Sequence, residues 1–145
     1  NMEQILTANN NNVDAVLSQN DGMAGGVVAA LSAQGLVIPV GGQDGDLAAI
    51  NRVARGSQTV SVWKDSRQLG TAAGEIASAL AAGTALDAID GAVKFSGGEK
   101  GIEMNAILLA PTPLTRANLS VAIDAGHISK EQACEGAIAG VDGCN

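Results

Sequence analysis

The stretch VIPVGGQDGDLAAI, residues 37–50, decides the fold class of this protein. Its first part, residues 37–42, is an apolar run of the kind that forms a buried strand. Residues 44–46 form a turn, and Asp46 can cap the helix that follows, whose apolar residues have helical spacing. A strand that passes through a short loop into a helix is the repeating unit of a parallel α/β sheet.

The same unit is present on both sides of this stretch. Residues 13–18 form an apolar run that predicts a buried strand, and residues 58–64 alternate polar and apolar side chains, which predicts another. A helix that ends at Gly35 separates the first two strands, and a long helix over residues 67–82 follows the third. Because such short connections require right-handed crossovers, we expect a doubly wound parallel sheet with helices on both faces.

The pattern changes after the long helix. Residues 92–95 and 106–109 are short strand-like pieces joined by a polar, glycine-rich segment, and together they predict a surface hairpin. The Pro-Thr-Pro tripeptide at residues 111–113 removes two backbone donors and forces an extended course. A crossing between domains fits this tripeptide better than a central strand.

The C-terminal tail predicts two helices and one cross-link. One helix is expected over residues 116–125 and another from Ser129, which has the spacing of a capping box with Gln132. Cys134 and Cys144 are close enough in sequence to form a disulfide, which would indicate an oxidising compartment. The alternative is a pair of free thiols, one on a helix and one on a frayed tail.

Composition and charge argue against several classes of protein. The chain has 145 residues, of which 46% are hydrophobic and 16% charged, so it can form a buried core. Its net charge of -7 disfavours binding to nucleic acid or to anionic lipid. The apolar stretches are too short to span a bilayer. The chain begins at Asn1 with helical spacing but without a cap or an initiating methionine, so we expect a cut N-terminus.

Three polar residues follow the three predicted strands, namely Asn20, Asp44 and Lys64. The carboxyl ends of parallel strands converge at one edge of a sheet, where ligands bind. An amide, a carboxylate and an ammonium group supply the donors and acceptors that a neutral sugar needs. The plainer alternative is that Asn20 and Asp44 are turn or cap residues and Lys64 a solvated strand end. Strand alternation points Trp63 away from Lys64, so we expect it to cover a neighbouring helix or hinge.

The sequence offers little support for an enzyme, a metal site or a cofactor site. His127, the only histidine, follows the predicted core in a linker, where a surface position is the plainer interpretation and no catalytic triad can form. Asp44 and Asp46 imitate the start of a calcium loop, but Ala48 and Arg55 occupy positions where oxygen ligands should follow. The glycines lack the spacing of dinucleotide and phosphate loops. We therefore expect no enzyme activity, no metal and no cofactor.

Five stretches of the chain resemble one known family. They are MEQILTANN at 2–10, SQND at 18–21, ALSAQGL at 30–36, GQDGDLA at 42–48 and VWK at 62–64. These stretches resemble the C-terminal half of the D-xylose-binding periplasmic proteins, which are receptors of sugar ABC importers. The similarity covers residues 1 to about 125. The tail with the two cysteines matches no motif of the family.

The resemblance implies the type I periplasmic-binding-protein fold, in which two α/β lobes are joined by hinge crossings and close around a sugar. The implied segments are residues 1–64 in the C-terminal lobe, residues 65–109 in the N-terminal lobe, and residues 110–145 as the last hinge crossing and the tail helices. The resemblance also assigns sugar contacts to the three strand-end residues. The first half of the family pattern is missing, so we expect this chain to bind sugar only together with that part.

The resulting hypothesis is a periplasmic receptor that binds an aldopentose, D-xylose first, and delivers it to the permease of an ABC importer. A sugar-responsive transcription repressor is the alternative from another class, because its effector core has the same fold and similar strand-end chemistry. A helix-turn-helix in the complete protein would favour the repressor. A signal peptide or a lipoprotein cysteine would favour the receptor.

Overall fold

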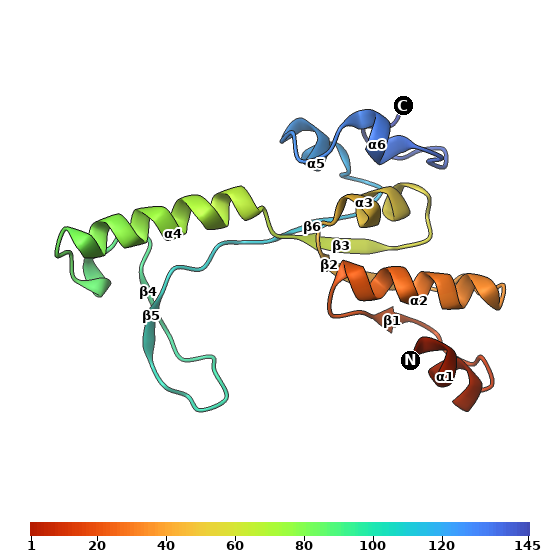
Figure 1. Cartoon of the computed structure of the whole chain (residues 1–145), viewed down its shortest axis with the longest axis horizontal. Helices are drawn as coiled ribbons and strands as arrows, with labels where there is room; N and C mark the ends of the chain where they lie inside the picture. Colours follow the sequence, from red (N-terminus) through yellow and green to blue (C-terminus); the bar gives the residue numbers. More distant parts are fainter. The chain divides into compact units, whose positions relative to one another are not determined.

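The computed structural model describes residues 1–145, which divide into two units. The larger unit consists of Asn1–Lys64 and Pro111–Asn145, and the smaller unit is Asp65–Ala110 (Figure 1). The chain thus leaves the larger unit after Lys64 and returns to it at Pro111. The two units are described separately below.

The larger unit contains a sheet with the strand order β1-β2-β3-β6. Its strands are β1 (Val16–Leu17), β2 (Val40–Asp44), β3 (Val60–Trp63) and β6 (Thr112–Leu114). The first three strands run parallel, and β6 pairs antiparallel with β3. The register places Gly42 beside Ser61 and Asp44 beside Trp63. The predicted parallel α/β sheet is therefore confirmed, with an antiparallel strand added at one edge.

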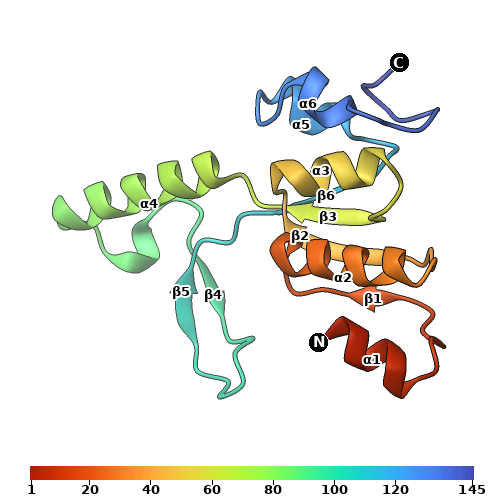
Figure 2. The ribbon, with the colours of Figure 1, turned by 45° about the vertical axis from the view of Figure 1, so that its right-hand side comes forward.

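Five helices belong to the larger unit (Figure 2). They are α1 (Met2–Ala8), α2 (Asp21–Ala33), α3 (Leu47–Ala54), α5 (Ser120–Asp124) and α6 (Lys130–Cys134). Gly35 ends the turn after α2 with a φ of 66°, a left-handed conformation that favours glycine. Ser129 and Gln132 form the predicted capping box at the start of α6.

The helices α2 and α3 lie on the same face of this chain's sheet, the face that carries Gly42 and Trp63. A side chain at Gly42 would meet Asp21 and Ala24 of α2. A side chain at the neighbouring Gly41, which faces the other way, would meet only Leu17 and the strands themselves. The physical reason is the strand order: the chain proceeds in one direction from β1 to β3, and right-handed crossovers then place successive helices on one side.

The strand predicted at residues 13–18 is also shorter and more exposed than expected. Only Val16 and Leu17 pair with β2, and Leu17 is 92% exposed. This side chain lies on the same face of the sheet as Gly41, opposite to the face against which α2 packs. An apolar run predicts a buried strand only where both faces are covered.

Two clusters of buried side chains form the core of the larger unit. One cluster joins α1, α2 and β2 and contains Met2, Leu6, Ala24, Ala30, Leu31 and Val40. The other joins α3, the end of the sheet and the tail; it contains Ile50, Val53, Ala54, Trp63, Leu114, Leu119, Ala122, Ile128, Ala133 and Val141. The tail is therefore an integral part of the larger unit and not an appendage.

The Pro-Thr-Pro tripeptide leads into β6, which lies at the edge of the sheet and is not a central strand. Thr112 lies beside Trp63, Pro113 beside Val62 and Leu114 beside Ser61. Because β6 is the edge strand, the proline nitrogen, which has no hydrogen to donate, does not interrupt a central ladder. Leu114 is fully buried against the second cluster.

The tail is fixed by a disulfide and by hydrogen bonds to α3. Cys134 and Cys144 are joined in a disulfide, and both pack against the second cluster. The side-chain amide of Asn51 donates to the carbonyl oxygens of Gln132, Ala133 and Glu135 at 3.3, 3.2 and 2.8 Å. One side chain of α3 thereby satisfies carbonyl groups at the end of α6, which otherwise lack partners.

The smaller unit consists of a helix, a 3₁₀ turn and a hairpin. Its elements are α4 (Ser66–Ala81), η1 (Leu86–Ala88), β4 (Val93–Phe95) and β5 (Met104–Ala106). The helix begins at the cap residue Asp65, whose carboxylate also bonds Arg67 and raises the pKa of that guanidinium. The strands β4 and β5 pair antiparallel, which confirms the predicted hairpin. No residue of this unit is buried.

Candidate functional site

Two of the three predicted site residues, Asp44 and Lys64, meet at the carboxyl edge of the sheet. Asp44 ends β2 and lies beside Trp63, so Lys64, the residue that follows β3, comes within reach. The Lys64 Nζ atom is 2.7 Å from the Asp44 Oδ1 atom, and both side chains are 41% exposed. This pair presents oxygen acceptors and ammonium donors to solvent at one point, where a polar ligand can reach both.

Asn20, the third predicted residue, has the capping role of the plainer alternative. Its Oδ1 atom accepts a hydrogen bond from the Met23 amide at 2.9 Å and caps α2. The neighbouring Gln19 carbonyl accepts from the Gln43 side chain at 3.4 Å, so the ends of β1 and β2 are connected. The structure gives no direct contact between Asn20 and the Asp44–Lys64 pair. A cap does not prevent the Asn20 amide nitrogen from donating to a ligand.

The backbone at Asp44 has an unusual conformation. Its φ is 107°, and that of the following Gly45 is 76°. A residue with a side chain rarely adopts a positive φ, and such residues cost about 1–3 kcal/mol and cluster at binding sites. Glycine is required at position 45 for a second reason, because a Cβ atom there would collide with the Trp63 ring. The turn after β2 is therefore held in a strained form by its surroundings.

A buried carboxylate, Asp21, holds this turn from the side of α2. Asp21 is only 1% exposed. Its Oδ2 atom accepts from the backbone amides of Gly45 and Asp46 at 2.9 and 3.0 Å, and from the Ser61 hydroxyl at 2.6 Å. Its Oδ1 atom accepts from the Gln58 side chain at 2.8 Å. A buried carboxylate is stable when its oxygens are bonded in this way.

Arg52 of α3 completes the network around Asp21. Its guanidinium donates to the Asp21 backbone carbonyl at 2.8 Å and to the Gln58 side-chain oxygen at 2.9 Å. Sequence reasoning missed this network. Asp21 directly follows a strand end, but an acidic residue in the first turn of a helix is ordinarily explained by the helix dipole alone. The partner Ser61 lies on β3 and Gln58 just before it, and no local pattern connects them to Asp21.

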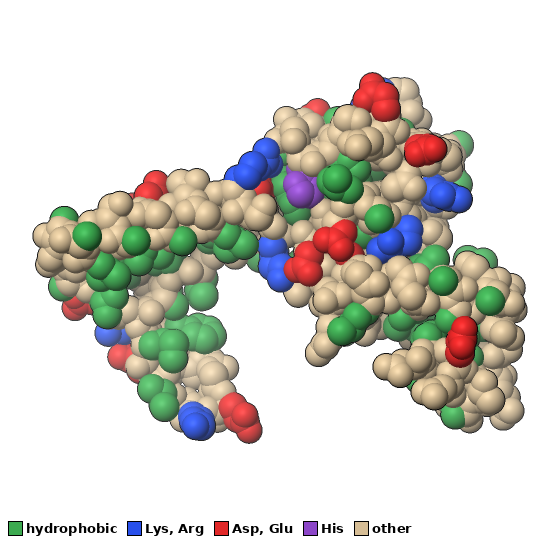
Figure 3. Space-filling view, viewed as in Figure 1, with side chains coloured by type: hydrophobic (Ala, Val, Ile, Leu, Met, Phe, Trp, Pro, Cys, Tyr) green, Lys and Arg blue, Asp and Glu red, His purple; other side chains and the backbone are tan.

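His127, predicted to be a surface linker residue, contacts the same turn from the other side. Its Nε2 atom is 2.7 Å from the Gly45 carbonyl oxygen, and its ring lies 5.0 Å from that of Trp63. A carbonyl oxygen only accepts, so the Nε2 atom carries the hydrogen and donates. His127 is half-buried among hydrophobic side chains, where it is the single purple group in Figure 3. His127 thus lies in the predicted linker, between α5 and α6, but it contacts Gly45 and Trp63, which the sequence did not indicate.

Trp63 packs in the core as strand alternation predicted. It is 5% exposed and belongs to the cluster with Ile50 and Val53 of α3. Its indole nitrogen is buried without a hydrogen-bond partner. The Trp63 ring thus packs against Gly45 and against the His127 ring, and Lys64 lies at the edge of the sheet beside Asp44.

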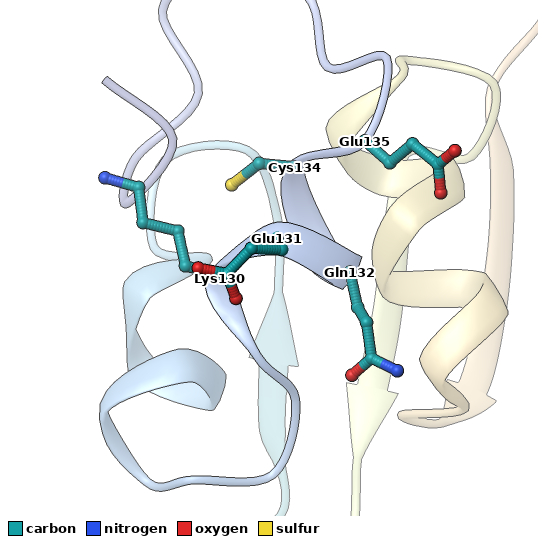
Figure 4. Close-up of a pocket in the computed structure, with 5 residues that line it drawn as sticks. All are labelled: Lys130, Glu131, Gln132, Cys134 and Glu135. Carbon is teal, nitrogen blue, oxygen red and sulfur yellow. The ribbon is translucent and has the colours of Figure 1, made fainter.

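Other hollows of the larger unit lie away from these strand ends. One, of about 550 Å³, lies over α6 and is lined by Lys130, Glu131, Gln132, Cys134 and Glu135. The polar ends of these side chains point in different directions (Figure 4), so they do not converge on a ligand. Another, of about 740 Å³, lies between α1, β1 and α2 and is mainly apolar.

The strand ends present groups that can form hydrogen bonds with a polar ligand. A carboxylate, an ammonium group and an amide are available there for charge-assisted and neutral hydrogen bonds. No group of three or more His, Cys, Asp or Glu side chains is arranged to hold a metal ion. None of the helices is long and apolar enough to cross a membrane.

Comparison with known proteins agrees with this architecture. The family model described as "Periplasmic binding protein domain" matches residues 1–85. The D-xylose-binding periplasmic protein of Haemophilus influenzae is 43% identical over 133 residues, which are 90% of this chain and 39% of that protein. The protein of the same name from Escherichia coli is 52% identical over 84 residues, 57% of this chain and 26% of that protein. The chain thus spans about two fifths or less of these relatives.

Solved structures give the same result. A carbohydrate transporter solute-binding protein from Chloroflexus aurantiacus, in complex with D-glucose, has a TM-score of 0.75 and 28% identity over 90% of this chain and 39% of that one. An ABC transporter solute-binding protein from Clostridium phytofermentans, with bound β-D-glucose, has a TM-score of 0.72 and 28% identity. The match covers 91% of this chain and 42% of that one. The fold is that of the type I periplasmic binding proteins, of which this chain supplies a part. The chain belongs to the periplasmic binding protein family.

Proposed function

We propose that this chain is the C-terminal part of a periplasmic receptor that binds an aldopentose, with D-xylose as the first choice, for a sugar ABC importer. The observation that carries the proposal is the pairing of Asp44 and Lys64 at the carboxyl edge of the parallel sheet. The relatives named for D-xylose at 43% and 52% identity support the choice of sugar. These relatives are periplasmic binding proteins, which favours the periplasm, and a receptor over a repressor, for this protein.

The site chemistry suits a neutral sugar. The Asp44 carboxylate would accept from two sugar hydroxyls, and the Lys64 ammonium group would donate to a third. Since the Oδ1 atom of Asn20 already caps α2, its amide nitrogen would act mainly as a donor. Each ligand hydroxyl both donates and accepts, so a mixed set of groups satisfies it better than a single charge. No bond is made or broken in this function, and we propose no enzyme activity.

The two units supply segments of both lobes in this proposal. Residues 1–64 would belong to the C-terminal lobe, 65–109 to the N-terminal lobe, and 110–145 to the last hinge crossing and the tail. The division of the chain after Lys64 and before Pro111 supports this assignment. The lobes would close around the sugar by hinge bending, and the closed form would be recognised by the membrane permease. The remaining part of the receptor would complete the site.

Titration of the complete receptor with xylose, ribose, arabinose and glucose in a calorimeter tests the proposal. We expect xylose to bind most tightly, and Asp44→Ala to weaken xylose binding by about 1–3 kcal/mol, because ligand hydroxyls lose a buried partner. Asp46→Ala is the matched control: it removes the same charge from the same turn, and the Asp46 side chain makes no capping hydrogen bond.

Two results would count against the proposal. Equal xylose affinity of the wild type and Asp44→Ala would remove Asp44 from the site. A wild-type receptor that binds none of the four sugars would refute the assigned ligand class.

A further inference from the structure

We propose that His127 is a positioning residue of the sugar site: it does not reach the ligand, but it holds the turn that directs Asp44. This inference rests on the function proposed above. It extends the site to the C-terminal tail, which contains none of the residues predicted to bind the ligand. All of the contacts involved lie within the larger unit.

The two peptide groups after Asp44 are held at three points. The amide of Gly45 donates to Asp21 Oδ2 and to the Ser61 hydroxyl at 2.9 and 3.1 Å. In the next peptide group the amide of Asp46 donates to Asp21 at 3.0 Å, and the Gly45 carbonyl accepts from His127 at 2.7 Å. This second peptide group is therefore fixed at both its nitrogen and its oxygen end. Such a group cannot rotate unless one of the two bonds breaks.

The strain at Asp44 makes these bonds necessary. A φ of 107° is unfavourable for aspartate, and an unrestrained turn would relax by rotating the peptide groups on either side of Gly45. A change of φ at Asp44 would rotate its Cβ atom about the N–Cα bond and so turn the carboxylate away from Lys64, whose Nζ atom is 2.7 Å from it. Asp21 resists this rotation from α2, and His127 resists it from the tail.

The tail is built to keep His127 in place. Ile128, the next residue, lies in the core and is only 4% exposed, and the Trp63 ring packs against the imidazole ring of His127. The disulfide between Cys134 and Cys144 and the hydrogen bonds from Asn51 fix the following segment on α3. The histidine thus comes from a rigid part of the fold, and its donor is available to the Gly45 carbonyl without further ordering.

The first test measures xylose affinity of the complete receptor carrying His127→Phe. Phenylalanine keeps an aromatic ring against Trp63 but has no donor for Gly45. Because a single hydrogen bond contributes about 0.5–1.5 kcal/mol, we expect affinity to fall about 3- to 10-fold. His127→Gln places an amide donor at a similar reach and should restore most of the affinity. Val53→Ala, a change at a buried core position of α3, should lower thermal stability and leave affinity unchanged.

The second test measures hydrogen exchange of the Gly45 and Asp46 amides in the sugar-free receptor. We expect both amides to exchange faster in His127→Phe than in the wild type and in His127→Gln. Val53→Ala should resemble the wild type at matched global stability. This measurement needs no ligand. It therefore tests whether His127 restrains the turn, independently of whether the site binds sugar.

Each combination of results gives a decision. Loss of affinity with faster exchange, both reversed by His127→Gln, supports the positioning role. Unchanged affinity in His127→Phe overturns the positioning role, even if the amides exchange faster. Unchanged amide exchange shows that His127 does not restrain the turn. A wild-type receptor that binds no sugar would refute the proposed function, and the exchange rates alone would then decide whether His127 restrains the turn.

Discussion

Both units of this chain contain an amphipathic helix, but the apolar side of the helix is buried only in the larger unit. Helix α3 of the larger unit presents Ile50 and Val53, which are fully buried beneath the sheet edge and the tail. Helix α4 of the smaller unit has an apolar stripe with similar spacing, yet Leu69 and Leu80 are nearly half exposed. Amphipathic periodicity therefore predicts a helix in both cases. Burial follows only where another element of the chain covers the stripe.

The smaller unit contains many apolar side chains and no buried one. Its exposed large hydrophobic residues are Leu69, Leu80, Leu86, Val93, Phe95, Ile102, Met104, Leu108 and Leu109. In Figure 3 hydrophobic side chains gather along α4 and over the hairpin. A hollow of about 490 Å³ lies between α4, the 3₁₀ turn and the segment after β5. An apolar surface of this kind typically receives another element. Under the proposed function, that element is the rest of the N-terminal lobe.

Leucine-to-alanine substitutions in each unit give the largest contrast. Leu114→Ala removes a fully buried side chain from the core of the larger unit and should reduce the free energy of unfolding by about 2–5 kcal/mol. Leu80→Ala in this chain should change it by less than about 0.5 kcal/mol, because the side chain is already exposed. Urea unfolding followed by the fluorescence of Trp63, the single tryptophan, reports on the larger unit.

The same pair of variants can contradict the comparison. If Leu80→Ala destabilises the larger unit as much as Leu114→Ala does, the smaller unit is not energetically separate. In the complete receptor, we expect Leu80→Ala to become destabilising, since the proposed N-terminal lobe would then cover this side chain.

Removal of the disulfide should have the next largest effect. The Cys134→Ser, Cys144→Ser double variant should be less stable by about 2–3 kcal/mol, because the cross-link restricts the unfolded tail. Reduction of the wild type with dithiothreitol should produce the same shift in the Trp63 unfolding midpoint, and the double variant serves as the control that does not respond. Amide exchange in β4 and β5 should not change, since the cross-link lies wholly in the larger unit.

The acid stability of the tail should depend on Asp142, with the smallest effect. Its carboxylate accepts from the Ser120 amide at 3.0 Å, and hydrogen bonds from Ser120 hold the pKa of Asp142 below its ordinary value of 3.8. The charged form is thus favoured in the folded state. Its contribution to stability is present above about pH 4 and is lost as the pH falls through the lowered pKa.

Thermal unfolding between pH 2 and pH 7 checks this dependence. The difference in midpoint between the wild type and Asp142→Asn should be constant above about pH 5 and should shrink in more acidic solution. Asp124→Asn removes the same charge from the exposed surface of α5 and is the control. A difference between wild type and Asp142→Asn that persists unchanged to pH 2 would show that the carboxylate charge is not involved.

The sequence by itself determined the parts of the structure that depend on neighbouring residues. Hydrophobic periodicity indicated the strands β2 and β3 and the helices α3 and α4, and the spacing of Ser129 and Gln132 indicated a capping box. Parallel strand order also predicted that the ends of β2 and β3 would meet, as they do at Asp44 and Lys64. All of these inferences use residues within one element and the rules that connect consecutive elements.

Only the tertiary structure decided what the turn after β2 contacts and which surfaces stay open. Asp21 and His127 reach Gly45 from opposite sides, across 24 and 82 residues of sequence. Leu17 is exposed because both following helices lie on the other face of the sheet. No local pattern encodes such contacts, since a hydrogen bond between distant segments depends on how those segments are packed together. The residues that hold the proposed site in shape were therefore invisible in the sequence, although the residues that form it were not.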